Sequence, residues 1–301
     1  MKKIIIAGGT GFLGEALISK YEKEFDEIVV LSRAIKPNKK NVRYVQWDAK
    51  SFGGWCMELE GANAIINLCG KSVDCRYTEK NKAIILSSRL DSAQIIGEAI
   101  LKCINPPKLW INGASATIYA HSENKRHTEL STEFGSGFSV EVCKAWENVF
   151  NDFTLPNTRK INLRISMVMG QGGGVFPVLI NLAKKGLGGT MGKGTQLVSW
   201  VHVDDFCSFV KWVIDNEKTT GVYNLVSPEP ITNKKMMKLF REKVHIKVGL
   251  PASEWMLKIG AFFLRTETEL ILKSRYSYPE KALNEGFLFK FKIMNDCLNN
   301  L

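Results

Sequence analysis

The chain has 301 residues, of which 45% are hydrophobic and 24% are charged, the composition of an ordinary soluble globular protein. Lys and Arg number 41 against 30 Asp and Glu, for a net charge of +11, but the basic residues are scattered and form no stripe with aromatic residues, so the charge does not indicate nucleic-acid binding. The seven cysteines contain no C-x-x-C pair, which argues against a zinc site or a disulfide framework and favours a reducing cytoplasm. No apolar stretch approaches the ~20 residues that a membrane helix needs.

The first predicted elements are a buried strand over residues 4–7 and a helix over 13–24, joined by Gly-Gly-Thr-Gly-Phe-Leu-Gly at 8–14. Gly8 permits a tight turn, Gly11 lets the backbone approach a pyrophosphate, and Gly14 lets the helix pack against the strand. The helix directs its first N–H groups at the phosphates. A surface turn could also contain three glycines, but their place between a strand and a helix predicts dinucleotide binding. The expected cofactor contacts here are Gly8, Thr10, Gly11, Phe12, Leu13 and Gly14.

Strand and helix patterns then alternate along the chain. Further strands are predicted over 27–31, 42–47, 64–68, 108–113, 160–165, 200–203 and 222–226, and helices over 81–103, 140–153, 178–185, 204–215 and from the capping residue Thr232 to 243. This alternation predicts an α/β fold with a Rossmann-type, doubly wound parallel sheet. Residues 1–225 are expected to form the cofactor-binding domain. Residues 226–301 are expected to form a smaller, mostly helical substrate lobe, to which 170–200 contribute.

The second predicted strand ends in Ser32-Arg33, where NAD-binding sites commonly carry an acidic residue for the ribose 2′-OH. The Ser32 hydroxyl and the Arg33 guanidinium suit a 2′-phosphate instead, so the sequence favours NADP(H) over NAD(H). The alternative for Arg33 is an exposed loop charge. Asp48, after the third strand, is a candidate to accept a hydrogen bond from the adenine amino group, or else a plain strand-end aspartate.

Small and polar residues follow the next two strands. Gly70, at the end of Asn67-Leu68-Cys69-Gly70, would let backbone pass close to the cofactor, or would simply form a turn. Ser115 lies at the carboxyl end of the fifth strand, where its hydroxyl could bind a substrate carbonyl or alcohol; a serine in a polar loop is the alternative. The expected cofactor contacts in this half are Asn67, Leu68, Cys69, Gly70 and Arg164.

Motifs spread over nearly the whole chain resemble those of extended short-chain dehydrogenase/reductases, in the NAD-dependent epimerase/dehydratase family. The general motifs are the glycine sequence, Asn67-Leu68-Cys69-Gly70, Ser115-Ala116 and Val203-Asp204-Asp205. Finer motifs are similar to those of the cell-division-inhibitor-like epimerase subgroup, which has a small C-terminal domain of unassigned role. They include Arg76-Tyr77-Thr78, Ser88-Arg89, Trp146-Glu147, Gly172-Gly173-Gly174, Ser199-Trp200-Val201-His202 and Gly286-Phe287. The resemblance implies a dinucleotide-binding oxidoreductase or epimerase.

The chain departs from this superfamily at its catalytic pair, a Tyr and a Lys four residues apart on a helix. In that pair the cation lowers the Tyr pKa, and the phenol relays a proton. Aligned on Glu147, the two positions hold Ser139 and Cys143, so the pair is absent. Ser115 and Tyr119 are the candidate catalytic residues that remain, although Tyr119 could equally be a half-buried aromatic. Weaker candidates, each with a structural alternative, are Cys143, Glu141 and His202.

Two functions therefore stay open. The first is an NADP(H)-dependent oxidoreductase or epimerase acting on a small hydroxyl or carbonyl substrate, which the glycine-rich stretch at 186–194 and the lobe over the crevice favour. The second is a non-catalytic NADPH-binding sensor or interaction protein, which the missing pair favours. We expect no metal site, no nucleic-acid or membrane partner, and a cytoplasmic monomer or homodimer.

Overall fold

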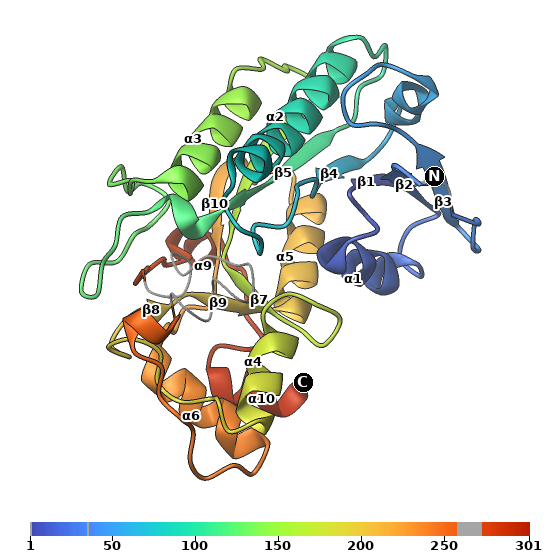
Figure 1. Cartoon of the computed structure of the whole chain (residues 1–301). Helices are drawn as coiled ribbons and strands as arrows, with labels where there is room; N and C mark the ends of the chain where they lie inside the picture. The colour runs from blue at the N-terminus through green and yellow to red at the C-terminus, as the bar shows by residue number, and fades with distance from the viewer. Residues whose placement is uncertain (1, 35, 258–272) are drawn as a thin grey trace.

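The computed structural model describes residues 2–34, 36–257 and 273–301, and its centre is a seven-stranded sheet (Figure 1). All neighbouring strands in it are parallel, in the order β10-β6-β5-β4-β1-β2-β3. The order reverses between β1 and β4, as in a doubly wound Rossmann fold, which confirms the predicted fold class. The strands are β1 (Lys3–Ala7), β2 (Glu27–Ser32), β3 (Val42–Gln46), β4 (Ala64–Asn67), β5 (Leu109–Ser115), β6 (Arg159–Ile165) and β10 (Gly221–Leu225).

Helices cover both faces of this sheet. Side chains alternate across a strand, so Ile4 and Ile6 of β1 pack into one core while Ile5 packs into the other. The first core is covered by α1 (Phe12–Tyr21) and α5 (Val203–Asp215), and the second by α2 (Glu79–Leu101) and α3 (Phe138–Asn151). Figure 1 shows α2 and α3 side by side on one face. Burial of β1 on both faces explains its continuous apolar run.

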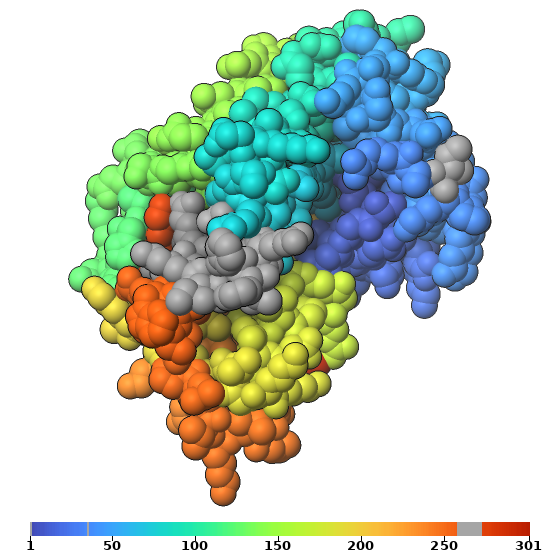
Figure 2. Space-filling view, in the orientation of Figure 1, coloured from blue at the N-terminus to red at the C-terminus, as the bar shows by residue number. Residues whose placement is uncertain are grey.

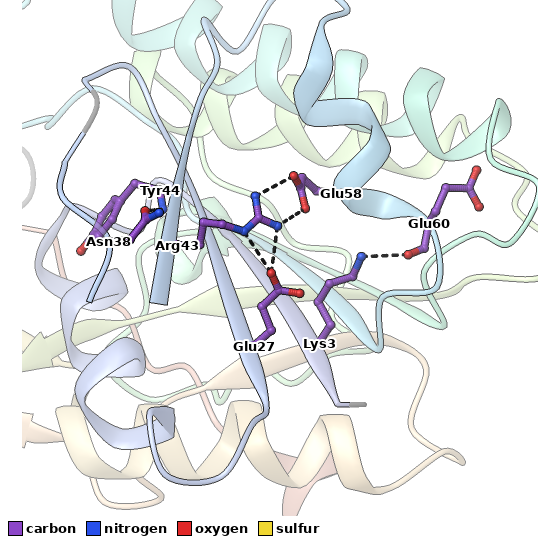
Figure 3. Close-up of polar contacts among 7 residues, drawn as sticks. All are labelled: Lys3, Glu27, Asn38, Arg43, Tyr44, Glu58 and Glu60. Atoms are coloured by element: carbon purple, nitrogen blue, oxygen red, sulfur yellow. Dashed lines mark hydrogen bonds and ion pairs between the residues drawn. The ribbon is translucent and has the colours of Figure 1, made fainter. Parts of the chain in front are cut away.

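A polar cluster fastens the edge strand β3 to its neighbours (Figure 3). The guanidinium of Arg43 lies between the carboxylates of Glu27 on β2 and Glu58 on the 3-10 helix η1 (Gly54–Leu59), at 2.8 and 2.6 Å from Nη2. Lys3 Nζ donates to the backbone oxygen of Glu60 at 2.9 Å. These contacts hold η1 and β3 against the rest of the sheet. They therefore fix the position of the sheet edge from which the turn after β2 extends.

A second, smaller core lies beyond the carboxyl edge of the sheet. It joins α4 (Phe176–Lys184), α6 (Asn233–Lys243) and α10 (Met294–Asn300), with the short strand pairs β7 (Met167–Met169) with β9 (Trp200–His202) and β8 (Leu197–Val198) with β11 (Ile231–Thr232). The Thr232 side chain accepts from Lys235 N, which confirms the predicted cap. Ala282 of α9 (Glu280–Asn284) and Phe287, which follows this helix, pack instead into the first sheet core. The segment 226–301 therefore contributes to both cores.

Candidate functional site

The glycine sequence forms the turn from β1 into α1, and its three predicted glycines differ in surroundings. Gly8 has φ +78°, and a Cβ there would lie 3.0 Å from Cys69 N. A Cβ on Gly14 would lie 2.4 Å from Gly9 Cα, so this glycine permits the close approach of helix and turn. A Cβ on Gly11 would meet no atom nearer than 3.6 Å. Gly8 and Gly14 are therefore required by packing, whereas Gly11 keeps the space above the turn clear.

The start of α1 fits a diphosphate. Gly11 is its N-cap residue and supplies no side-chain cap, so the first-turn N–H groups, including those of Phe12 and Leu13, lack a side-chain acceptor. A cavity of about 500 Å³ adjoins this turn, lined by Thr10, Gly11 and Phe12 on one side and by Gly172 and Val203 on the other. In Figure 2 the blue surface of the N-terminal segment borders the yellow-green surface of a segment from the middle of the chain. N–H groups at a helix start bind phosphate oxygens.

The turn after β2 presents one of its two predicted side chains to solvent. Ser32 is buried, and its hydroxyl donates to Ala34 O at 2.8 Å and accepts from Ala34 N at 3.3 Å. A phosphate that contacted the Ser32 hydroxyl, as the sequence predicts, would have to compete with these hydrogen bonds to Ala34. Arg33 is exposed and forms no ion pair with the residues that the structure describes. Arg33 lies near the Cys69 thiol. Burial raises the pKa of this thiol to about 12, and the Arg33 charge opposes the rise.

Asp48 follows β3 in an exposed turn. Its Oδ1 accepts hydrogen bonds from Lys50 N at 2.9 Å and Ser51 N at 2.8 Å, and these bonds lower the pKa of the carboxyl group. The carboxylate is therefore ionised and oriented by its own turn. A contact with adenine stays a prediction.

The loop after β4 contains one side chain that turns away from any cofactor. Asn67 is fully buried, and its amide donates to Asn112 Oδ1 at 3.0 Å and accepts from Cys69 N at 3.2 Å. The Asn67 side chain is thus engaged within the protein, where it shapes the loop, and the expected cofactor contact of Asn67 stays a prediction. Leu68 is partly buried against the first core. Gly70 is exposed, and a Cβ there would lie 3.0 Å from Cζ of Arg89.

Ser115 ends β5 at the carboxyl edge of the sheet, as predicted for its place in the chain. Its hydroxyl donates to Thr117 Oγ1 at 3.0 Å and accepts from Thr117 N at 3.2 Å, which caps the 3-10 helix η2 (Ala116–Ile118). The side chain is half-buried. A hydroxyl can rotate toward a second partner, so this geometry is compatible with the predicted substrate contact.

Tyr119 and Arg164 lie together in the interior, which argues against the roles expected for both. Tyr119 is 1% exposed; its hydroxyl donates to Thr128 O or Asn224 Oδ1, at 2.9 and 2.8 Å, and accepts from Arg164 Nη1 at 2.7 Å. Arg164 Nε and Nη2 donate to the two carboxylate oxygens of Glu147 at 2.8 and 2.7 Å. Burial raises the pKa of Tyr119. These hydrogen bonds engage the Tyr119 hydroxyl, which a proton donor would need, and the Arg164 guanidinium, which a cofactor ligand would need.

The helix α3 carries the two positions where the superfamily's pair would lie. Ser139 and Cys143 are both buried, one turn apart. Burial, reinforced by the charge of Glu147, raises the pKa of Cys143 to about 12, so the thiol is neutral near pH 7. The Ser139 hydroxyl lies 3.1 Å from the phenol oxygen of Tyr77, in the loop before α2. Tyr77 and Arg89 were not among the predicted site residues, although both stand in motifs that carried the resemblance.

The weaker candidates have structural partners. His202 is the N-cap residue of α5: its Nδ1 accepts from Asp204 N at 2.9 Å, and burial lowers its pKa to about 4. Glu141 is exposed and pairs with Lys144 at 3.2 Å. Within the described ranges there is no cluster of three or more His, Cys, Asp or Glu side chains able to hold a metal ion. The helices described there include none long and apolar enough to cross a membrane.

Comparisons with known proteins agree with this architecture. Residues 4–225 match the model of the NAD dependent epimerase/dehydratase family. The epimerase family protein YfhF of Bacillus subtilis (strain 168) is 32% identical over 99% of this chain and 97% of its own length. An epimerase family protein of Staphylococcus aureus (strain N315) is 27% identical over 100% of this chain and 99% of its own. The crystal structure of the human epimerase family protein SDR39U1 (isoform 2) with NADPH has a TM-score of 0.88 and 26% identity, covering 99% of this chain and 98% of that one.

Proposed function

Because this chain belongs to the NAD dependent epimerase/dehydratase family, we propose that it is an NADP(H)-dependent oxidoreductase or epimerase that acts on a small hydroxyl or carbonyl substrate. The observation that carries the proposal is the turn from β1 into α1. There, Gly11 leaves space above an uncapped helix start, while Gly8 and Gly14 are fixed by packing. This division of roles is the one expected for a turn that binds a diphosphate.

The turn after β2 supports NADP(H) over NAD(H). Arg33 is exposed and has no acidic partner within the described residues, and its planar guanidinium matches a phosphate group. The human relative described above was crystallised with NADPH. Ser32 adds less than the sequence indicated, because its hydroxyl is engaged by Ala34.

The remaining residues divide the site into two halves. The glycine turn and Arg33 would hold the adenosine and diphosphate groups. The rest of the dinucleotide would then extend across the switch point, over the carboxyl ends of β4 and β5. Bound NADP(H) would supply hydride transfer at its nicotinamide ring. Ser115, at the end of β5, would orient the substrate oxygen through its hydroxyl.

A second function, an NADPH-binding sensor without turnover, is favoured by one observation. Ser139 and Cys143 replace the superfamily's pair, and burial keeps the Cys143 thiol neutral. Tyr119 offers no substitute, because its hydroxyl is enclosed by Arg164, Asn224 and Thr128.

One experiment separates these functions. NADPH binding is measured by fluorescence titration, and NADPH oxidation is then followed at 340 nm with a library of aldehydes, ketones and oxo acids. The enzyme proposal predicts tight binding together with oxidation that Ser115→Ala reduces. Tight binding with no oxidation would favour the sensor, and absence of NADPH binding would contradict both.

A further inference from the structure

A partly buried cation, Arg89, lies at the carboxyl end of the sheet without an acidic partner among the residues that the structure describes. Arg89 projects from α2, and its guanidinium lies between Gly70 and the indole of Trp146. Its Cζ is 5.2 Å from the indole centroid and 3.0 Å from the position that a Cβ on Gly70 would occupy. Glycine at position 70 therefore makes room for the guanidinium, which explains this residue without reference to the cofactor.

The hydrogen bonds of Arg89 leave most of its donors unused. Nη1 donates to Lys71 O at 3.1 Å and to Ile85 O at 3.0 Å, and no carboxylate of the described residues lies within ion-pair distance. Burial lowers the pKa of Arg89, and the ionisable groups that oppose this effect are Cys143 and Tyr77, which are neutral in their ordinary state. A partly desolvated cation that meets only neutral groups among the described residues is unfavourable, because charges removed from water are normally paired.

One hydroxyl group, that of Tyr77, lies near this cation, and a second lies next to Tyr77. The Tyr77 phenol oxygen is 3.1 Å from Ser139 Oγ, and the Tyr77 ring packs edge-on against Phe138 at 4.9 Å between centroids. Tyr77 and Cys143 both lie close enough to Arg89 for their charges to act on it. The segment that follows β4 and the start of α3 thus bring together one guanidinium and two hydroxyls.

We propose that Arg89, with the hydroxyls of Tyr77 and Ser139, binds a carboxylate group of the substrate. The inference rests on the proposed function, because it takes the half of the site over β4 and β5 to be the substrate end. A planar guanidinium matches a carboxylate through two parallel N–H···O bonds, and hydroxyl donors complete its acceptor sites. The cofactor phosphates are already matched by the start of α1 and by Arg33, on the other side of the switch point.

The test uses NADPH-saturated protein and isothermal titration with acetate, malonate, pyruvate and 2-oxobutyrate, with inorganic phosphate as the competing anion. We expect at least one carboxylate to bind, and Arg89→Met to weaken that binding by about tenfold or more, the loss of a charge-assisted pair. Tyr77→Phe should weaken it less. The NADPH affinity should change by less than about twofold in both variants. The matched control is Lys102→Met, at the end of the same helix and over the exposed Phe52 ring.

Several results would overturn the inference. These are the absence of binding by every carboxylate, binding unaffected by Arg89→Met, tighter binding of phosphate, or a tenfold loss of NADPH affinity in Arg89→Met, which would make Arg89 a cofactor ligand. If Arg89→Met does not fold, Arg89→Lys replaces it, since this variant keeps the charge and loses the planar donor pair; unchanged carboxylate binding in it contradicts the proposal. Failure of the wild-type protein to bind NADPH in a separate titration would instead contradict the proposed function.

Discussion

Arg164 Nη1 lies 2.7 Å from the phenol oxygen of Tyr119, and both side chains are buried. The same guanidinium pairs with both carboxylate oxygens of Glu147, so it links β6 to α3 and to the loop that carries Tyr119. The two residues therefore act as one structural unit beneath the site. The sequence predicted a catalytic role for Tyr119 and a cofactor contact for Arg164, whereas in the structure these two residues are hydrogen-bonded to each other.

The first prediction concerns Tyr119→Phe. Removing the hydroxyl leaves an N–H of Arg164 and the oxygen of Asn224 without their partner in the interior, which should lower the free energy of unfolding by about 1–3 kcal/mol. The measurement is urea denaturation. Tyr44→Phe, at a half-exposed ring on β3, is the control and should change stability by less than about 0.5 kcal/mol. Unchanged stability of Tyr119→Phe combined with lost NADPH oxidation would restore Tyr119 as a catalytic residue.

The second prediction concerns Gly11→Ala. A Cβ at this position has space in the protein, since its nearest atom lies at 3.6 Å, but it would project where the diphosphate is expected. We expect the melting temperature to stay near the wild-type value and the NADPH affinity to fall by about tenfold or more. Gly54→Ala is the matched control, because a Cβ there meets no atom within 4 Å and the position lies in η1. Unchanged NADPH affinity in Gly11→Ala would place the diphosphate elsewhere.

The third prediction concerns Gly14→Ala. Its Cβ would lie 2.4 Å from Gly9 Cα, a contact with backbone that cannot move aside cheaply. Overpacking of this kind should lower the free energy of unfolding by about 1–3 kcal/mol, as measured by thermal and urea denaturation. A variant as stable as the wild type would show that α1 and the turn do not pack as closely as described.

The fourth prediction concerns pH and His202. Burial lowers the pKa of His202 from its ordinary 6.5 to about 4, so folding favours the neutral ring. Its contribution to stability is therefore complete above pH 6.5 and is lost as the pH falls toward 4, by about 3 kcal/mol in total. Urea denaturation between pH 7 and pH 4 should show this loss in the wild type and a smaller loss in His202→Asn, which retains an N-cap acceptor for α5. The same dependence of stability on pH in His202→Asn as in the wild type would contradict the assignment.

The sequence predicts well those features that depend on neighbouring residues. The glycine turn, the alternating strands and helices and the Thr232 cap are local, because turn geometry and helix starts are decided within a few residues. The orientation of polar side chains is not local. Asn67 turns inward because Asn112 lies on the adjacent strand, and Arg164 turns inward because Glu147 lies above it on α3.

The same limit explains the omission of Arg89 and Tyr77. One partner of Tyr77 is Ser139, 62 residues away, and the surroundings of Arg89 come from α2, α3 and the loop after β4. No spacing rule connects these segments. Their relation becomes visible only when the sheet order places β4 beside β5 and packs α2 against α3.

The most direct test of the central claim is a fluorescence titration of NADPH and NADH against the wild-type protein, Arg33→Ala and Lys36→Ala. Lys36 is the control because it lies close in sequence and is paired with Glu15. We predict that the wild type and Lys36→Ala bind NADPH at least about tenfold more tightly than NADH, and that Arg33→Ala loses most of this preference through weaker NADPH binding. Equal affinities in the wild type, or an unchanged preference in Arg33→Ala, would contradict the account.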